Sequence, residues 1–221
     1  MMRKTVATNF LVVLVWCALS GCATLKLGGD GGGKLAIRSQ SEKDLVLKSG
    51  FDTGIYRFDD KNRLIAVLFD GPVDHPTQVL TIRMFWKPHP GNTPIDATAT
   101  NASVHYIIFT GDDREEVGIY SGAGFVYPNS KPGGKRLRAG VWQANLRLAD
   151  ASDGFVDLLG QSLLKGRFTA QLDELNINQV LHRINVHVQQ RLGYPRSVRK
   201  PDAIQRSNRG PIHGRRASPL G

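Results

Sequence analysis

Hydrophobic and polar residues alternate along most of the chain between residues 35 and 172. In "VWQANLRLA" (141–149), Trp142, an alanine and two leucines occupy one set of alternate positions, while polar residues occupy the other. The segment "LKGRFTAQL" (164–172) repeats this alternation. Successive side chains of a strand point to opposite faces of a sheet. The period of two therefore predicts β-strands with one buried face, and it places Trp142 on that face.

Two other segments are apolar at both sets of alternate positions: "RLIAVLF" (63–69) and "VHYIIF" (104–109), while "QVLTIRMFW" (78–86) is intermediate. Strands that are covered on both faces show such runs, so 63–69 and 104–109 are predicted to be central strands. Short polar turns separate the strands, for example "DDKN" (59–62) and "PNSKPGG" (128–134). This succession predicts a mainly β fold, either an antiparallel β-sandwich or a partly open barrel.

A single C-terminal amphipathic helix is predicted over residues 177–192, because apolar residues recur there at three- and four-residue spacing. These residues are Ile177, Val180, Leu181, Ile184, Val188 and Leu192. Asn176, with a glutamine three residues later, can cap the start, and Gly193 followed by Pro195 ends the helix. The apolar face should pack on the sheet or close one end of it. A last strand over 184–188 is the alternative.

Residues 1–21 have the layout of an export signal. Arg3 and Lys4 form a basic head, residues 10–19 are nearly all apolar, and small residues follow. A membrane-spanning helix needs about 20 apolar residues, roughly twice the length of this run. A signal that is removed after export is therefore favoured over a permanent membrane span.

The apolar run ends in Leu19-Ser20-Gly21-Cys22, which resembles the lipobox of bacterial lipoproteins. The resemblance implies that a diacylglyceryl group is attached to the Cys22 sulfur and that the chain is cleaved before Cys22. It also implies that the new amino terminus receives a further acyl chain, such as palmitate. An ordinary export signal with a coincidental cysteine is the alternative.

The residues around Cys22 refine this expectation. In Gram-negative lipoproteins, an Asp after the cysteine often marks retention in the inner membrane, so Ala23 favours the outer membrane, on the side that faces the periplasm. Cys17 lies within the apolar run, where it acts as a small hydrophobic residue, and it would leave with the signal. Because Cys22 would be the one cysteine left, no disulfide can form within the mature chain.

Charge is unevenly distributed along the 221 residues, which carry a formal net charge of +10. Residues 191–221 hold eight Lys/Arg and one acid, whereas residues 22–190 carry a net charge of +1. The mature chain is therefore predicted to comprise a Gly-rich tether (22–34), one domain (35–195) and a basic, disordered tail (196–221).

The histidines of the predicted helix give no metal site. His182 and His187 are five residues apart, which separates them by about 140° around the helix axis, so they cannot share a metal ion. Both are interpreted as surface or boundary residues.

Two acidic segments offer carboxylates for a metal ion or for catalysis. The segment "GDDREEVG" contains Asp112, Asp113, Glu115 and Glu116. Their spacing matches no calcium-binding loop, and a solvated turn is favoured. In "DGPVDHP" (70–76), Asp70 or Asp74 could pair with His75, but the two prolines favour a turn there as well.

Motifs of hydrolases are missing from the sequence. No Gly-x-Ser-x-Gly elbow occurs, and no free thiol would survive processing. We therefore predict no cofactor and no metal, and we favour a non-enzymatic role.

The segment "YSGAGFVYP" (120–128) sets small residues between Tyr120 and the pair Phe125 and Tyr127. Two interpretations are open. The aromatic residues could form a ligand platform, because missing side chains let a ligand approach closely. Alternatively, the glycines mark a β-bulge within a strand.

The basic tail would attract anions through cations that include Arg199, Lys200, Arg215 and Arg216. Export excludes nucleic acid as a normal partner. The anions expected nearby are lipid headgroups, lipopolysaccharide phosphates or peptidoglycan carboxylates. A solubilising tail without a dedicated partner is the alternative.

Together these features predict a lipid-anchored envelope protein that acts as an accessory or binding module. An envelope hydrolase or metal-dependent enzyme, with a site assembled from dispersed residues, is the alternative. A cleft that gathers His75, His105 or His182 with two carboxylates would favour the enzyme. The oligomeric state cannot be inferred from these residues.

Overall fold

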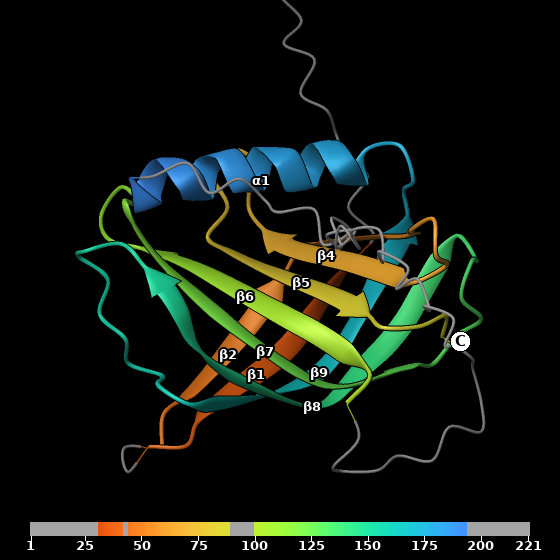
Figure 1. Ribbon diagram of the computed structural model, residues 1–221, viewed down its shortest axis with the longest axis horizontal. Coiled ribbons are helices and arrows are strands. Elements are labelled where there is room, and N and C mark those ends of the chain that lie inside the picture. The colour runs from red at the N-terminus through yellow and green to blue at the C-terminus, as the bar shows by residue number, and fades with distance from the viewer. Residues whose placement is uncertain (1–30, 42–43, 89–99, 194–221) are drawn as a thin grey trace, which may run out of the picture.

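The computed structural model describes residues 31–41, 44–88 and 100–193. The predictions for the export signal, for Cys22, for tether residues 22–30 and for the basic tail lie outside these residues. The described chain forms nine strands and one helix (Figure 1). In chain order these are β1 (Gly32–Ser39), β2 (Val46–Phe51), β3 (Thr53–Phe58), β4 (Leu64–Asp70), β5 (Gln78–Met84), β6 (Ala102–Thr110), β7 (Glu116–Pro128), β8 (Arg136–Ala151), β9 (Ser162–Leu172) and α1 (Ile177–Leu192).

The strands form one sheet that closes on itself. Neighbouring strands follow the order β2-β1-β9-β3-β4-β5-β6-β7-β8, and β8 pairs again with β9. The pairs are antiparallel except for a short parallel contact between β3 and β9, which spans Ile55–Gln171 and Tyr56–Leu172. The predicted mainly β fold with a single C-terminal helix is confirmed, and it takes the form of a barrel.

Two hydrophobic cores share the strands of this barrel. One core fills its interior, and the other lies between the outer face of the sheet and α1. β4 contributes to both: Leu64, Ala66 and Leu68 belong to the interior core, whereas Ile65, Val67 and Phe69 belong to the core under α1. All six residues are buried. The uniformly apolar segment 63–69 is thus covered on both faces, as predicted, and α1 provides one of the covers.

Helix α1 has the predicted bounds, so the alternative strand over 184–188 is wrong. Gly193 ends the helix in the left-handed conformation (φ 72°), which glycine adopts without steric strain. The predicted N-terminal cap is not formed. Asn176 instead donates from its backbone and side-chain amides to the Asp173 carboxylate, at 2.9 and 3.1 Å.

Among the described residues, no helix combines the length and hydrophobicity needed to cross a membrane.

The domain begins three residues earlier than predicted, because β1 starts at Gly32 within the Gly-rich segment. The glycines permit a close approach of strands. A Cβ at Gly32 (φ 144°) would lie 2.4 Å from the Phe51 carbonyl oxygen. A Cβ at Gly166 would lie 2.5 Å from the Lys34 carbonyl oxygen. These contacts lie close to the point where β9 leaves β1 and joins β3.

The predicted orientation of Trp142 is wrong. The register of β8 against β9 shifts between Val141 and Ala144. A β-bulge of this kind sets two residues opposite one and changes the alternation of side chains. Val141 and Ala144 are both buried, whereas Trp142 is 45% exposed.

Candidate functional site

The described histidines do not converge on one site. His105 lies on β6, and its Nδ1 atom is 3.0 Å from Ser121 Oγ on β7. His182 is exposed on α1, as predicted. His187 is buried, with ring centroids 4.9 Å from Phe109 and 5.3 Å from His75. It is not the surface or boundary residue that was predicted, because α1 turns its ring toward the core.

A cavity of about 380 Å³ beside α1 is lined by His75, His182 and His187. Asp74 is the only carboxylate among the described residues that line it, and it pairs with Arg183 at 3.2 Å. Within the described part of the chain, no group of three or more His, Cys, Asp or Glu side chains is placed to hold a metal ion. This cavity does not provide the two carboxylates that would favour an enzyme.

Both acidic segments form turns, as predicted. Residues 71–77 turn between β4 and β5, and residues 111–115 turn between β6 and β7. The Asp74 carboxylate pairs with a helix arginine rather than with His75. Neither turn presents the catalytic or metal-binding arrangement that was considered for it.

The segment "YSGAGFVYP" lies in β7, and register shifts against β8 occur at Tyr120 and Phe125. The interpretation as a bulged strand is confirmed. Tyr120 and Phe125 are 1% and 4% exposed, so they cannot form a ligand platform. A Cβ at Gly122 would lie 1.7 Å from the Asn145 carbonyl oxygen, so the glycine allows the backbone of β8 to approach β7 closely. Tyr127 does line a pocket, described next.

A basic face covers the outer side of β8, β9 and β1, which are neighbours in the sheet. β1 and β9 carry two Lys/Arg each and no acid, while β8 carries three and one acid, Asp150, near its end. The cations alternate with buried apolar residues, and this period directs them outward. We define the basic face by the exposed cations and the aromatic residues beside them: Lys34, Arg138, Lys165, Arg167, Tyr127 and Trp142.

A groove of about 1080 Å³ follows the cations of the basic face. Strand register places Arg167 of β9 opposite Lys34 on one side and opposite Gly140 on the other. The Tyr127 ring covers Gly140, where a Cβ would lie 2.4 Å from a ring carbon. A second cavity of about 220 Å³ adjoins the groove beside Trp142. Such an array can bind phosphate or carboxylate groups through charge-assisted hydrogen bonds.

The cations of the basic face have no counter-charge among the residues that the structure places. Lys34, Arg138, Lys165 and Arg167 form no ion pair with any of the residues described. By contrast, Arg38 at the far end of β1 pairs with Asp44 at 2.6 Å. The hydrogen bond from this guanidinium lowers the pKa of the Asp44 carboxyl. Unpaired surface cations produce a local positive potential that attracts anions.

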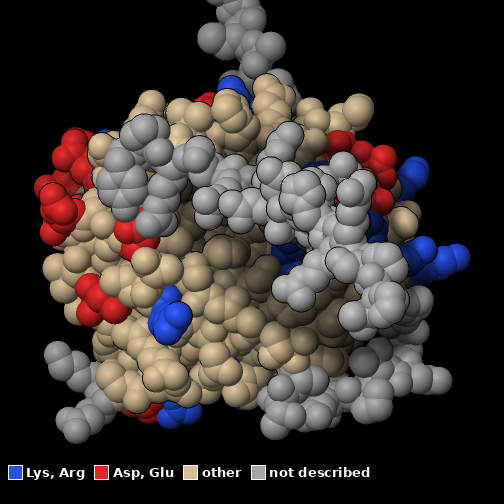
Figure 2. All heavy atoms as spheres, viewed as in Figure 1, with Lys and Arg blue, Asp and Glu red and all other residues tan. Residues whose placement is uncertain are grey.

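Acidic residues gather at the other end of the barrel. The β6–β7 turn and the β8–β9 loop hold Asp112, Asp113, Glu115, Asp153 and Asp157, and Glu116 begins β7 beside them. The two segments adjoin, because the Ser152 N–H donates to the Val117 carbonyl oxygen at 2.9 Å. Figure 2 shows several Asp and Glu along the left edge of the molecule, and Lys and Arg at the right edge together with a second acidic group at the upper right. The domain is nearly neutral in sum, but these acids lie apart from the basic face.

The basic face is absent from the sequence-based predictions, because residues 34, 138 and 167 become neighbours only through the pairing of distant strands. The signal that could have revealed it is the lack of acids at the polar positions of these strand segments. The predicted anchor Cys22 and the tail residues lie outside the described chain.

No protein-family model matches the chain, and neither a curated protein nor a solved structure matches it at a significant level.

Proposed function

We propose that the protein is a lipoprotein of the bacterial cell envelope that is anchored through Cys22 and binds anionic surface groups through its basic face. Its role is that of a non-enzymatic binding module. One observation carries this proposal: Lys34, Arg167 and Arg138 are exposed and aligned along one groove, and they form no ion pair with the residues that the structure describes.

The position of the groove favours a partner at the membrane. Gly31 lines the groove and follows Cys22 by nine residues. Nine residues span at most about 30 Å when extended and about 15–18 Å as a Gly-rich coil. A lipid on Cys22 would therefore hold the basic face within reach of the headgroups of the same membrane.

The side chains of the basic face suit an anionic membrane surface. A Lys or Arg near such a surface contributes about 1 kcal/mol of binding free energy. Trp142 and Tyr127 belong to the residue types that are enriched at the level of the headgroups. The acyl chains would supply most of the attachment, since two or more chains anchor stably. The basic face would then set the orientation of the domain.

The anions closest to a lipid-anchored domain are headgroup phosphates, and we favour these over peptidoglycan carboxylates because the groove lies next to the tether. In a Gram-negative cell, the favoured location is the outer membrane, facing the periplasm. The basic tail, with Arg199, Lys200, Arg215 and Arg216, would add further cations to the same contact. Nucleic acid is not a proposed partner.

The anchor is tested by the substitution Cys22→Ala. We expect loss of palmitate labelling and release of the protein from the membrane fraction, because no thiol remains for the thioether bond. Cys17→Ala serves as the control and should leave labelling unchanged. Membrane attachment of Cys22→Ala, with no change in mass and no accumulated precursor, would contradict the anchor.

The basic face is tested separately with the chain from residue 22 onward carrying Cys22→Ala, so that no lipid contributes. Sedimentation with vesicles of phosphatidylcholine and phosphatidylglycerol should show binding, and Arg138→Gln with Arg167→Gln should weaken it about tenfold or more. Arg38→Gln is the matched control, because Arg38 is already paired with Asp44. Equal binding by the double variant and the parent would refute the role of the basic face.

A further inference from the structure

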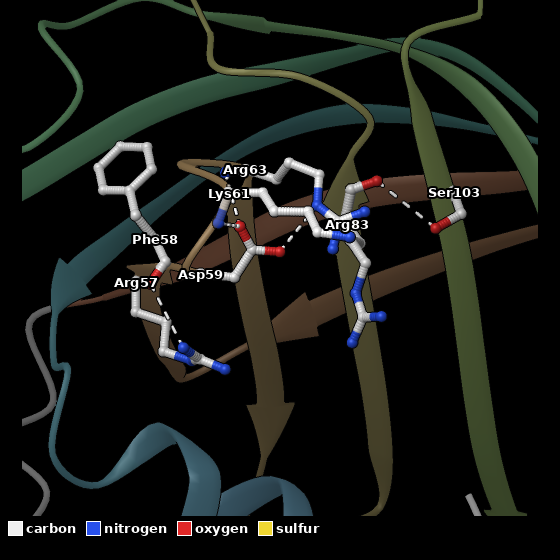
Figure 3. A network of polar contacts seen from close by, with 7 residues as sticks. All are labelled: Arg57, Phe58, Asp59, Lys61, Arg63, Arg83 and Ser103. Carbon is white, nitrogen blue, oxygen red and sulfur yellow. Dashed lines mark hydrogen bonds and ion pairs between the residues drawn. The ribbon is translucent and has the colours of Figure 1, made fainter. Parts of the chain in front are cut away.

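Three arginines and one aspartate gather where β3, β4 and β5 run side by side (Figure 3). Strand register sets Arg57 of β3 opposite Ile65, and Ile65 opposite Arg83 of β5. Because neighbouring strands are 4.7–4.9 Å apart, the two arginine Cα atoms lie about 10 Å apart. Figure 3 shows both guanidinium groups extending toward the side on which α1 lies. We call Arg57 and Arg83 the arginine pair.

The acid of this cluster, Asp59, is fully engaged elsewhere. Its carboxylate accepts hydrogen bonds from Arg63 Nε at 2.8 Å, from the Arg63 N–H at 2.8 Å and from the Lys61 N–H at 3.0 Å. Burial opposes ionisation of this carboxyl, but the hydrogen bonds outweigh burial and lower its pKa. Asp59 therefore neutralises Arg63 and closes the β3–β4 turn.

Within the described parts of the chain, the arginine pair has no counter-charge. Arg57 donates one hydrogen bond, from Nη1 to the Phe58 carbonyl oxygen at 3.3 Å, while its Nε is buried without a partner. The Arg83 side chain makes no hydrogen bond or ion pair with the described residues, although its carbonyl oxygen accepts from Ser103 Oγ at 3.4 Å. Both arginines are half-buried. Half-burying a cation without a partner costs free energy, so such an arrangement suits a site that is completed by an anion.

The neighbouring strand supports this interpretation. His105 on β6 has a lowered pKa, through burial of its ring and through the charge of Arg83. Both effects disfavour the charged imidazole, and so disfavour a third positive charge beside the pair. It keeps its contact of 3.0 Å with Ser121 Oγ.

We propose that the arginine pair binds one oxyanion, a phosphate ester or a carboxylate, between its two guanidinium groups. Two arginine side chains are long enough to converge on one anion across a separation of about 10 Å, and guanidinium groups match the geometry of phosphate and carboxylate oxygens. The pair lies on β3 and β5, whereas the basic face lies on β8, β9 and β1. The two sites can therefore be tested independently.

The test uses the chain from residue 22 onward with Cys22→Ala, titrated with inorganic phosphate, glycerol 3-phosphate and succinate. Calorimetry and the NMR signals of arginine Nε–Hε groups report binding. We expect saturable binding at about 1 mM or below, weakened about tenfold for each arginine replaced in Arg57→Gln and Arg83→Gln. A preference for glycerol 3-phosphate over free phosphate would identify an esterified ligand, and a preference for succinate a carboxylate ligand.

The matched control is Arg38→Gln with Arg183→Gln, which removes the same number of arginines at positions already paired with Asp44 and Asp74 and outside both proposed sites. This control should bind the probes within about twofold of the parent, because long-range charge effects are screened by salt. The variant Arg57→Lys with Arg83→Lys keeps the charge and should still bind more weakly, since lysine cannot bind bidentately. Equal weakening in the control, or no saturable binding of any probe by the parent, would overturn the proposal. Thermal unfolding of each variant verifies that a loss of binding is not a loss of fold.

Discussion

At the scale of single residues, the barrel core accommodates polar atoms by directing them to its rim. It holds three of the five tyrosines: Tyr56, Tyr106 and Tyr120. The Tyr106 hydroxyl donates to Gln78 Oε1 at 3.0 Å, and the Tyr120 hydroxyl donates to Asp157 Oδ1 at 2.5 Å. Burial raises the pKa of Tyr106 to about 12 and raises that of Tyr120 as well. Tyr120 is thus a structural residue that ties β7 to the β8–β9 loop.

His187 gives the fold a dependence on pH. Its pKa is lowered by burial, then by the charges of Arg191 and His75; Arg114 lowers it further, while Asp74 opposes them. The unfolded chain takes up this proton near pH 6.5, whereas the folded chain takes it up at lower pH. Below about pH 6.5 the unfolded state therefore binds more protons, and stability falls as the pH falls.

We expect the free energy of unfolding, measured with urea, to be smaller at pH 5.5 than at pH 7.5. His187→Leu should reduce this difference, because the buried position then carries no titrating group. The exposed residue His182 provides the control, and His182→Leu should keep the difference of the parent chain. An unchanged difference in His187→Leu would show that other groups set the pH dependence.

At the scale of elements, the packing of β7 against β8 depends on missing side chains. A Cβ at Gly122 would lie 1.7 Å from the Asn145 carbonyl oxygen. We expect Gly122→Ala to lower the free energy of unfolding by about 2–3 kcal/mol, because the strands must move apart. Gly50→Ala is the control, since a Cβ at Gly50 would meet no atom within 4 Å. Urea unfolding of both variants checks this expectation, and equal stabilities would contradict it.

The spacing of apolar residues predicted the helix and the strands well, because this spacing reflects the local backbone geometry of each element. The bounds of α1 follow from the spacing of its apolar residues and from Gly193. The burial of segment 63–69 on both faces was also predictable. That α1 covers its outer face was not, since helix packing depends on distant residues. Trp142 was misplaced because a bulge of two residues changes the alternation.

The candidate sites depended on pairings that no local pattern records. Lys34 and Arg167 are far apart in the sequence and become neighbours only when β1 pairs with β9. Arg57 and Arg83 likewise converge through β4, which lies between their strands. The aromatic platform, the alternative to the confirmed bulged strand, is wrong for a related reason: aromatic residues beside glycines form the same sequence pattern whether the rings face a ligand or the core.

At the scale of the whole molecule, the basic face makes binding to an anionic membrane sensitive to salt. The Debye length falls from about 30 Å at 0.01 M salt to about 8 Å at 0.15 M, so attraction between the basic face and the membrane weakens. We expect vesicle binding of the unlipidated chain to fall steeply over this range, as measured by sedimentation. The variant Arg138→Gln with Arg167→Gln should show a shallower dependence, because fewer cations take part. The same slope in both chains would contradict a contact through this face.

The pairing of β1 with β9 also constrains when the barrel can form. The first strand finds its neighbours in β2 and in the last strand, with Gly32 opposite Thr169. A chain that emerges amino terminus first, from a ribosome or through a translocation pore, cannot close the barrel until β9 has followed. Until then the barrel is incomplete and the chain can still pass through a pore. An amino terminus held at the membrane would stay near the pore until β9 has emerged.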